Sequence, residues 1–333
     1  MEFGALFLGD PPFDRVIDFA KLAEECGFDY VWTADSHVLW MEPWLQYTVI
    51  ARETERIKIG PLVTNPGTRD WTVLASLLAT LNEISDGRAV CGIGRGDSAR
   101  RTIGQKPVSV KEWERSIPVI KAIAQGESVD YEGHTVKIPW ASGHPVEMWG
   151  AAYGPKALGV VGRQCEGYVL QLADPDILQW CRRYLDDAAE AVGRPASAIR
   201  TMISAPPYVI ETPEERDHAQ SQLRWFAGSV ANHVADLIDA HGAQGLPSQL
   251  TDFMQQRPEY DYEHHGKPNN PRTEYVPDEI NERFCVIGTV DEHVAKLKHL
   301  ESLGMEVFTG YFIHDNIEAT MRAYGEHIIP QFK

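Results

Sequence analysis

The 333-residue sequence has no apolar run that approaches the ~20 residues needed for a membrane-spanning helix. Its opening residues, MEFGALFL, lack the basic segment that begins a secretory signal, and Gly-Asp-Pro-Pro follows them directly. We therefore expect a strand at the start of the chain, a cytoplasmic location and no membrane partner.

Positive charge is also scarce. The chain carries 31 lysine and arginine residues against 48 aspartate and glutamate residues, which gives a formal net charge of −17. Because binding to nucleic acid requires a cationic surface, this balance argues against a nucleic-acid partner. It leaves room for an anionic small molecule, since a few local basic groups are enough to hold one.

Cysteine is scattered and odd in number, and no two of the residues form a C-x-x-C pair. The five are Cys26, Cys91, Cys165, Cys181 and Cys285. We expect them to be reduced thiols of a cytosolic protein. The 12 histidines include no H-E-x-x-H spacing, so we expect no metal site.

What the sequence does contain is a regular alternation of apolar strands and amphipathic helices. Eight segments have the pattern of strands, and most of them are followed by a helix. The expected strands are residues 4–8, 28–33, 57–63, 88–93, 147–151, 167–172, 201–210 and 306–313. This order predicts an α/β fold of the (β/α)8, or TIM-barrel, class. A Rossmann fold fits less well, because no G-x-G-x-x-G follows the first strand.

A (β/α)8 barrel typically uses about 250 residues, so the remaining length has to lie in insertions. The longest expected insertion is 244–277, which is rich in Pro, Gly, Asn, Gln, His and Glu. A segment of that length belongs in a compact domain only as a lid or an interface. We therefore predict a single domain over 1–333, with an insertion around 244–277.

Active sites of such barrels lie where the strands end, and Asp35 and His37 come just after the second expected strand. A carboxylate beside an imidazole can anchor a polar ring and move a proton. A helix cap followed by a surface histidine explains the same spacing equally well, so both interpretations stay open on the residues alone.

Two further strand ends carry features of anion sites. The turn 94–97 (GRGD) follows the fourth strand, and Arg100 and Arg101 lie behind it. Glycine lets the backbone approach a ligand and arginine binds phosphate or carboxylate, although a plain turn before a solvated helix fits as well. Residues 152–156 place Pro155 in the first turn of a helix, where free amides can hold a phosphate. For this segment the spacing favours a simple helix start.

Four segments together resemble one known family. Residues 61–69 (PLVTNPGTR) and 92–97 (GIGRGD) resemble the strand-3 and strand-4 signatures of methylenetetrahydromethanopterin reductases. Residues 151–158 (AAYGPKAL) and 285–292 (CVIGTVDE) resemble the phosphate segment and the entry to the penultimate helix in the wider bacterial luciferase-like family. The sequence is thus similar to luciferase-like oxidoreductases, on the methylenetetrahydromethanopterin reductase branch.

The resemblance implies a cofactor site at the C-terminal ends of the barrel strands, for coenzyme F420 or, alternatively, FMN. Asp35 and His37 would be the catalytic residues, with His37 as the proton donor, and a non-prolyl cis peptide is expected within 62–64. The implied cofactor contacts are Asp35, Val63, Thr64, Asn65, Gly94, Arg95, Gly96, Ala151, Ala152, Gly154, Pro155, Lys156 and Gln171. Of these, Thr64 and Asn65 would bond the ring, and 154–156 would hold the phosphate.

Two activities are compatible with this resemblance. The reductase signature favours an F420-dependent oxidoreductase that transfers a hydride between reduced deazaflavin and a small organic substrate. The alternative is an FMN-dependent monooxygenase that uses reduced flavin and O2 and has a separate flavin reductase as partner. A cofactor-poor partner subunit is a third interpretation. The family also implies a homodimer through helices 2 and 3, the latter expected at 71–84. The insertion 244–277 and Arg95, where the reductase tends to have proline, depart from the pattern and leave the substrate open.

Overall fold

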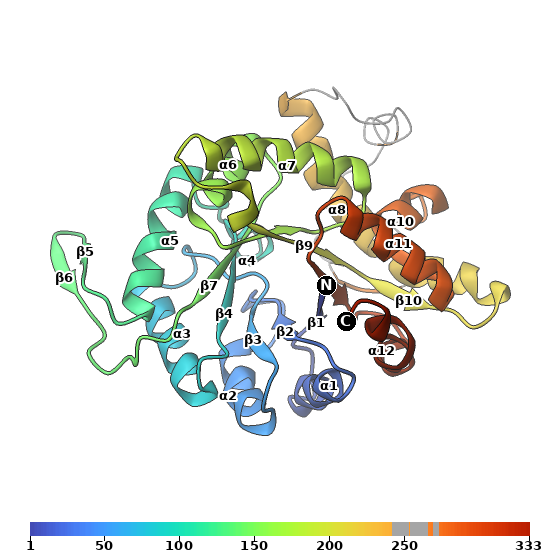
Figure 1. Cartoon of the computed structure of the whole chain (residues 1–333), viewed down its shortest axis with the longest axis horizontal. Helices are drawn as coiled ribbons and strands as arrows, with labels where there is room; N and C mark the ends of the chain where they lie inside the picture. The colour runs from blue at the N-terminus through green and yellow to red at the C-terminus, as the bar shows by residue number, and fades with distance from the viewer. Residues whose placement is uncertain (242–252, 254–265, 269–272) are drawn as a thin grey trace.

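The computed structural model describes residues 1–241, 253, 266–268 and 273–333. Eight parallel strands form a ring that helices surround (Figure 1). The ring strands are β1 (Glu2–Phe7), β2 (Tyr30–Thr33), β3 (Lys58–Pro61), β4 (Val90–Ile93), β7 (Glu147–Ala151), β8 (Gly167–Leu170), β9 (Arg200–Ala205) and β12 (Val307–Tyr311). The predicted (β/α)8 barrel is confirmed.

Strand pairing closes the ring. The strand order is β3-β2-β1-β12-β9-β8-β7-β4. The two end strands, β3 and β4, meet through the parallel bridges Ile59–Ala89 and Thr64–Ile93. Because all eight strands run in the same direction, their carboxyl ends gather at one mouth, which is where barrels of this class place their sites.

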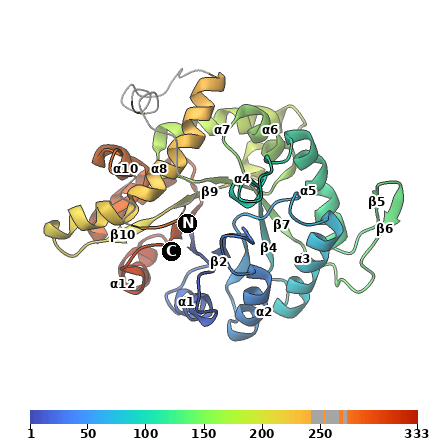
Figure 2. The same cartoon turned by 180° about the vertical axis from the view of Figure 1, so that it is seen from behind.

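Helices surround the ring, and residues next to a helix end can fix where the helix begins. They are α1 (Asp14–Glu25), α2 (Pro43–Glu53), α3 (Trp71–Ser85), α5 (Val110–Ala124), α6 (Pro155–Gln164), α7 (Pro175–Glu190), α11 (Val290–Ser302) and α12 (Ile317–Ala323). At the start of α3, for example, Asp70 Oδ1 accepts a 2.8 Å hydrogen bond from the Thr72 amide. A short helix, α4 (Asp97–Arg101), directly follows β4 and lies near the centre of the ring in Figure 2.

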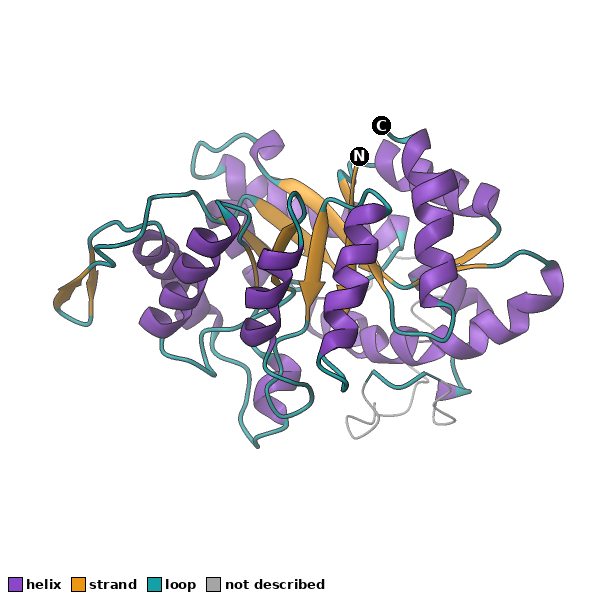
Figure 3. Cartoon of the chain, turned by 90° about the horizontal axis from the view of Figure 1, so that it is seen from below, coloured by secondary structure: helices purple, strands orange, loops and turns teal. Residues whose placement is uncertain are grey.

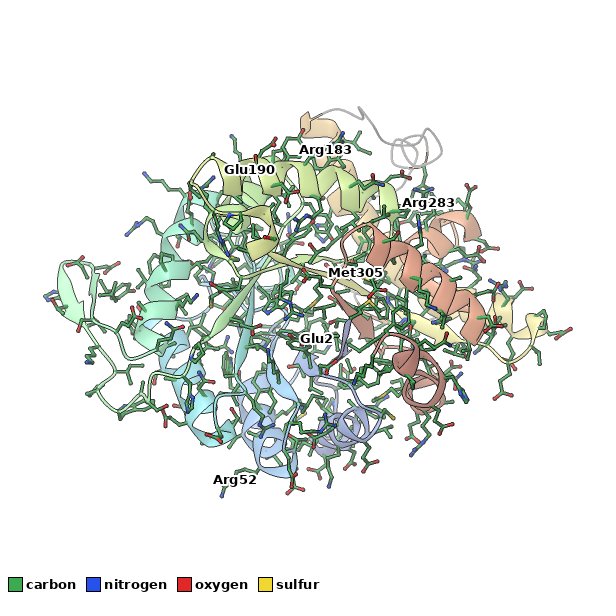
Figure 4. All side chains as sticks on the ribbon, in the orientation of Figure 1. Glu2, Arg52, Arg183, Glu190, Arg283 and Met305 are labelled. Atoms are coloured by element: carbon green, nitrogen blue, oxygen red, sulfur yellow. The ribbon has the colours of Figure 1, made fainter. Side chains whose placement is uncertain are left out.

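The amino-terminal end of the barrel is filled by polar and aromatic side chains. Glu2 is labelled near the ring centre in Figure 4. It accepts a 2.7 Å hydrogen bond from the Tyr30 hydroxyl and forms an ion pair with Arg200. The Tyr30 ring stacks on Trp32 with its centroid 5.4 Å away. Both rings are fully buried, so the interior below the mouth is a packed core rather than a channel.

The prediction of one strand over 201–210 is wrong. The ring strand β9 ends at Ala205, and β10 (Pro207–Val209) pairs instead with β11 (Val286–Gly288) in a separate two-stranded sheet. Pro206 and Pro207 have no backbone N–H, so the hydrogen-bond ladder of the ring cannot continue through them.

The chain between β10 and β11 contains helices that the sequence analysis did not predict. They are α8 (Arg216–His241) and α10 (Asp278–Phe284). In Figure 3, α8 lies at the end of the barrel opposite the two termini. Most of the predicted insertion 244–277 lies outside the described residues, which include 253, 266–268 and 273–277 of it. The single-domain assignment over 1–333 stays a prediction.

A hairpin follows α5: its strands are β5 (Val129–Tyr131) and β6 (His134–Val136), which pair antiparallel. It projects from the side of the ring (Figures 1 and 3). Among the described helices, none combines the length and the apolar character that crossing a membrane requires.

Candidate functional site

A pocket opens at the mouth of the barrel, between the ends of the ring strands and α8. It holds about 930 Å³ of empty space, part of which is open to solvent. Six of the predicted contacts line it: Asp35, Val63, Asn65, Gly96, Ala151 and Gln171. Its lining combines apolar side chains with a few polar groups, as is typical of pockets that bind organic ligands.

Asp35 is the most deeply buried acid of this pocket, with 1% of its surface exposed. Its Oδ2 accepts a 2.7 Å hydrogen bond from the Thr64 hydroxyl and another of 2.7 Å from Arg69 Nη1. Its other oxygen, Oδ1, is buried and has no hydrogen-bond partner among the described residues. A buried carboxylate oxygen left in this state is a strong acceptor for a ligand donor.

Arg69 ties this acid to the start of α2. Its Nη2 binds both carboxylate oxygens of Glu42 at 2.8 Å, one residue before the helix begins. Burial alone would lower the pKa of Arg69, but the two carboxylates of Asp35 and Glu42 outweigh it and raise that pKa. The guanidinium therefore stays charged and fixes Asp35 in one orientation.

The segment after β3 lies against the turn after β4. The Leu62–Val63 peptide bond is cis, as the resemblance predicts for 62–64. The Thr64 amide donates to the Gly92 carbonyl at 2.9 Å, and the Gly94 amide donates to the Thr64 carbonyl at 2.8 Å. These bonds join the two strand ends into one wall of the mouth.

Two glycines keep that wall thin. A Cβ on Gly94 would lie 3.0 Å from Val63 Cγ2, and a Cβ on Gly96 would lie 2.7 Å from Asn65 Cγ. Gly96 also has a φ of +79°, which favours glycine. These glycines therefore let the turn after β4 pack closely against residues 63–65, while Gly96 also lines the pocket.

On the opposite side, β8 and β12 contribute a polar pair. Gln171 Nε2 donates to the Tyr311 hydroxyl at 2.9 Å, and the Tyr153 hydroxyl donates to the Gln171 carbonyl at 3.3 Å. Burial raises the pKa of Tyr311, although the hydrogen bond from Gln171 acts in the other direction. Tyr311 therefore remains protonated at neutral pH.

The predicted phosphate segment begins α6 beside this wall. Gly154 is the N-cap, Pro155 is the first helical residue, and no side chain of the described residues caps this end. The Lys156 side chain is exposed, and the Ala152 carbonyl accepts a 3.2 Å hydrogen bond from Tyr168. The amides of the first turn are therefore left without a side-chain cap from the described residues, next to an exposed lysine.

The remaining predicted residues lie away from the pocket lining. His37 is exposed, between the lining residues Ser36 and Trp40. Arg95 Nε donates to the Val108 carbonyl at 2.7 Å, and Arg100 Nε donates to the Lys106 carbonyl at 2.7 Å. Arg101 pairs with Asp97 four residues earlier in α4. Each of these three arginines thus uses some of its N–H donors to stabilise the loop and the short helix after β4.

Several lining residues were missed by the sequence analysis. Trp225, Ser229 and His233 come from α8, and His233 stacks on Tyr153 with ring centroids 5.1 Å apart. Their positions depend on α8 crossing the mouth, for which the sequence carries no local signal. Trp40, whose position a few residues after Asp35 indicates a place at the pocket, does line it.

Comparisons with known proteins agree with the fold and with the resemblance of the sequence. The family model described as luciferase-like monooxygenase matches residues 1–306. The 5,10-methylenetetrahydromethanopterin reductase of Archaeoglobus fulgidus is 27% identical over 352 residues, and the match covers 100% of both chains. The F420-dependent glucose-6-phosphate dehydrogenase of Microbacterium testaceum is 27% identical, with 96% of this chain and 94% of the relative covered.

A solved structure shows the same architecture. The coenzyme F420-dependent tetrahydromethanopterin reductase from Methanopyrus kandleri superposes with a TM-score of 0.79 at 22% identity, covering 100% of this chain and 99% of that one. At this identity the superposition establishes the fold. The family model spans nearly the whole chain, so the protein belongs to the luciferase-like monooxygenase family and, with it, to the (β/α)8-barrel oxidoreductases.

Proposed function

We propose that this chain is an F420-dependent oxidoreductase that transfers a hydride between reduced deazaflavin and a small organic substrate. The observation that carries the proposal is the buried carboxylate of Asp35, whose Oδ1 has no partner among the described residues at the mouth. A buried polar atom in this state is costly unless a ligand bonds to it. The F420-dependent relative from Microbacterium testaceum supports the choice of cofactor.

The residues at the mouth fit a planar, polar-edged ring. Asp35 Oδ1 would accept a hydrogen bond from it, and Asn65 and the backbone of 94–96 would line it. When bound, F420 supplies or takes up the hydride. The protein then has to hold the cofactor ring and the substrate so that their reacting carbons face each other, and to exclude water.

The first turn of α6 is the proposed site for the phosphate of the cofactor. Its amides are uncapped by side chains of the described residues, and the helix dipole favours an anion there. Gly154, Pro155 and Lys156 would hold that anion, and Lys156 adds a positive charge in a protein whose net charge is −17. Ala151 and Gln171 would line the path between ring and phosphate.

A carbonyl or imine that receives the hydride also needs one proton. We assign this proton to His37, which is exposed and lies in the chain between the lining residues Ser36 and Trp40. An exposed imidazole exchanges protons with solvent between turnovers, which a proton donor requires.

An anaerobic assay tests this activity. Reduced F420 is incubated with the protein and a panel of small ketones, imines and conjugated alkenes, and its reoxidation is followed by absorbance. The proposal predicts reoxidation that depends on both the protein and an organic acceptor. Protein-dependent oxygenation of an organic substrate by reduced FMN in a parallel aerobic assay, together with no reaction of reduced F420, would overturn it in favour of an FMN-dependent monooxygenase supplied by a separate flavin reductase. The family description supports that second candidate.

A second copy of the chain is the partner that we propose. Leu45 on α2 and Val73 on α3 are 64% and 50% exposed, and the two helices are neighbours in the ring (Figure 1). Apolar side chains exposed on adjacent helices are a common feature of protein interfaces. A homodimer through α2 and α3 would cover both.

A further inference from the structure

One face of α8 lines the mouth pocket. Trp225, Ser229 and His233 follow one another at intervals of four residues, so their side chains lie on the same side of the helix. All three line the mouth pocket. We call these three residues the α8 face. A molecule in the mouth contacts this face as well as the strand ends.

Two aromatic contacts hold α8 against the barrel. His233 stacks on Tyr153, which follows β7, with ring centroids 5.1 Å apart and an angle of 17° between the rings. Phe226, the residue after Trp225, packs against Tyr311 at the end of β12, with centroids 5.3 Å apart. The helix is therefore docked on the ends of β7 and β12.

The residues proposed to hold the cofactor ring belong to other strands. Asp35, Asn65 and Gly96 follow β2, β3 and β4. Within the barrel, β1 separates β2 from β12, and β4 separates β3 from β7. A cofactor ring held by Asp35 and Asn65 therefore leaves the α8 face for the second reactant.

Ser229 is the polar centre of the α8 face. Its side chain lines the mouth pocket and is 6% exposed. Its hydroxyl oxygen is not fully covered and has no hydrogen-bond partner among the described residues. A hydroxyl in the wall of a pocket gains free energy when a polar atom of a ligand bonds to it.

Large rings flank this hydroxyl along the helix. Trp225 lies about one turn before Ser229 and His233 about one turn after it. Trp225 is 3% exposed and His233 is half-buried. Because serine is much smaller than either neighbour, the α8 face is recessed at Ser229. Planar side chains on both sides of a recess favour a ring as its occupant.

The charges of the mouth disfavour an anionic substrate. Asp35 and Asp97 line the pocket, whereas no lysine or arginine does so among the described residues. Arg69 and Arg101 pair with these two acids but are not part of the lining. A carboxylate or phosphate on the substrate would approach like charges, and an uncharged substrate avoids that repulsion.

We propose that the α8 face selects the substrate. The substrate is an uncharged molecule with a ring that packs against Trp225 and His233, and with a hydroxyl or carbonyl oxygen, remote from the reacting carbon, that bonds Ser229 Oγ. That the occupant undergoes hydride transfer rests on the proposed function. That Ser229 bonds the occupant rests on the α8 face itself.

Three probes with one skeleton test the proposal by isothermal titration. They are 4-ethylphenol, ethylbenzene, which lacks the oxygen, and 4-ethylbenzoate, which carries a negative charge. The protein is saturated with oxidised F420, so that Asp35 is occupied, and the titrations are repeated without F420. We expect 4-ethylphenol to bind about three- to tenfold more tightly than ethylbenzene, because its oxygen bonds Ser229. The anionic probe should bind more weakly than either.

Two substitutions at one position separate the hydroxyl from the recess. Ser229→Ala removes the hydroxyl, so the preference for 4-ethylphenol over ethylbenzene should disappear. Ser229→Leu fills the recess, so both uncharged probes should bind about tenfold more weakly or worse. Ser221→Ala is the matched control, because Ser221 lies on the same helix but bonds the His218 carbonyl at 2.7 Å, and it should keep the preference.

An equal preference in the wild type and in Ser229→Ala, unchanged binding of the uncharged probes to Ser229→Leu, or 4-ethylbenzoate as the tightest probe would overturn the proposal. The fluorescence of F420 is titrated with each variant. Normal F420 binding with no preference among the probes overturns the role of the α8 face and leaves the proposed function intact. Failure of F420 to bind the wild type, with a preference that depends on Ser229, overturns the proposed function and leaves the α8 face as a ligand surface.

Discussion

Arg69 donates a 2.7 Å hydrogen bond to Oδ2 of Asp35 and so leaves Oδ1 of the same carboxylate as the acceptor at the barrel mouth. Arg69 follows β3 and Asp35 follows β2, so the two side chains come from neighbouring strand ends. Since Arg69 also binds Glu42, the carboxylate is oriented before any ligand arrives. Preorganised acceptors of this kind bind donors without a cost of reorientation.

Asp35→Asn keeps the shape of the side chain but removes the charge from the acceptor, so F420 should bind about 10- to 100-fold more weakly. Fluorescence titration measures this. Glu42→Gln is the matched control, because Glu42 contacts the same guanidinium, and it should change the affinity less than threefold. Wild-type affinity in Asp35→Asn would remove Asp35 from the cofactor site.

His37→Ala removes the proposed proton donor. If His37 delivers the proton, turnover with an organic acceptor should fall about 100-fold or more, whereas the F420 affinity should change less than twofold. Steady-state kinetics and fluorescence titration separate the two effects. His327→Ala, at an exposed histidine, should match the wild type. Unchanged turnover in His37→Ala would contradict its role as proton donor. Asp97, which lines the pocket, would then be the next residue to test.

Lys156→Met tests the phosphate site at α6. An exposed cation next to an anion contributes modestly, so F420 should bind about two- to fivefold more weakly at low salt. The difference should vanish in 1 M NaCl, where charges are screened within ~3 Å. Lys111→Met, at an exposed lysine of α5, is the control. An equal loss for both variants would count against a phosphate at α6.

His293 predicts how stability depends on pH. It is fully buried, its Nε2 bonds the Tyr208 carbonyl at 3.1 Å, and burial lowers its pKa to about 4. Between about pH 6.5 and 4 the unfolded chain binds a proton at this residue and the folded chain does not, so stability falls as the pH falls. From pH 7 to pH 5 this histidine alone should cost about 2 kcal/mol of the free energy of unfolding.

Urea unfolding of His293→Gln at both pH values checks this expectation, because glutamine does not titrate. The drop between pH 7 and 5 should be smaller than in the wild type by about 2 kcal/mol. His327→Gln should keep the full drop, since that side chain is largely exposed. The same drop in all three proteins would contradict the account of His293.

The proposed dimer is tested by Leu45→Asp. A charge at a buried interface is costly, so this variant should run as a monomer in light scattering, whereas the wild type should have twice the 37.3 kDa mass of the chain. Val192→Asp, at a 54% exposed valine that follows α7, should remain dimeric. A monomeric wild type would remove the dimer from the account.

The barrel could be predicted from the sequence because its signals are local. Apolar segments, caps such as Asp70 and stops such as Asp86 mark each unit separately. The segment 201–210 was misassigned because its apolar character continues through Pro206 and Pro207, whose missing amides end the ring strand. The apolar character of a segment does not show which sheet the strand joins.

The candidate site was only partly predictable. Asp35 and the glycines of 94–96 lie at strand ends, where barrel topology alone places them at the mouth. α8 is buried on more than one side, with Leu223, Trp225 and Phe226 all covered, so it shows no single apolar stripe.

A fluorescence titration of the same purified protein with F420 and with FMN tests the proposed cofactor directly. An F420 site at Asp35 predicts saturable binding of F420, with FMN at least tenfold weaker, and a loss of F420 binding in Asp35→Asn. Tight binding of FMN with no binding of F420 would contradict it.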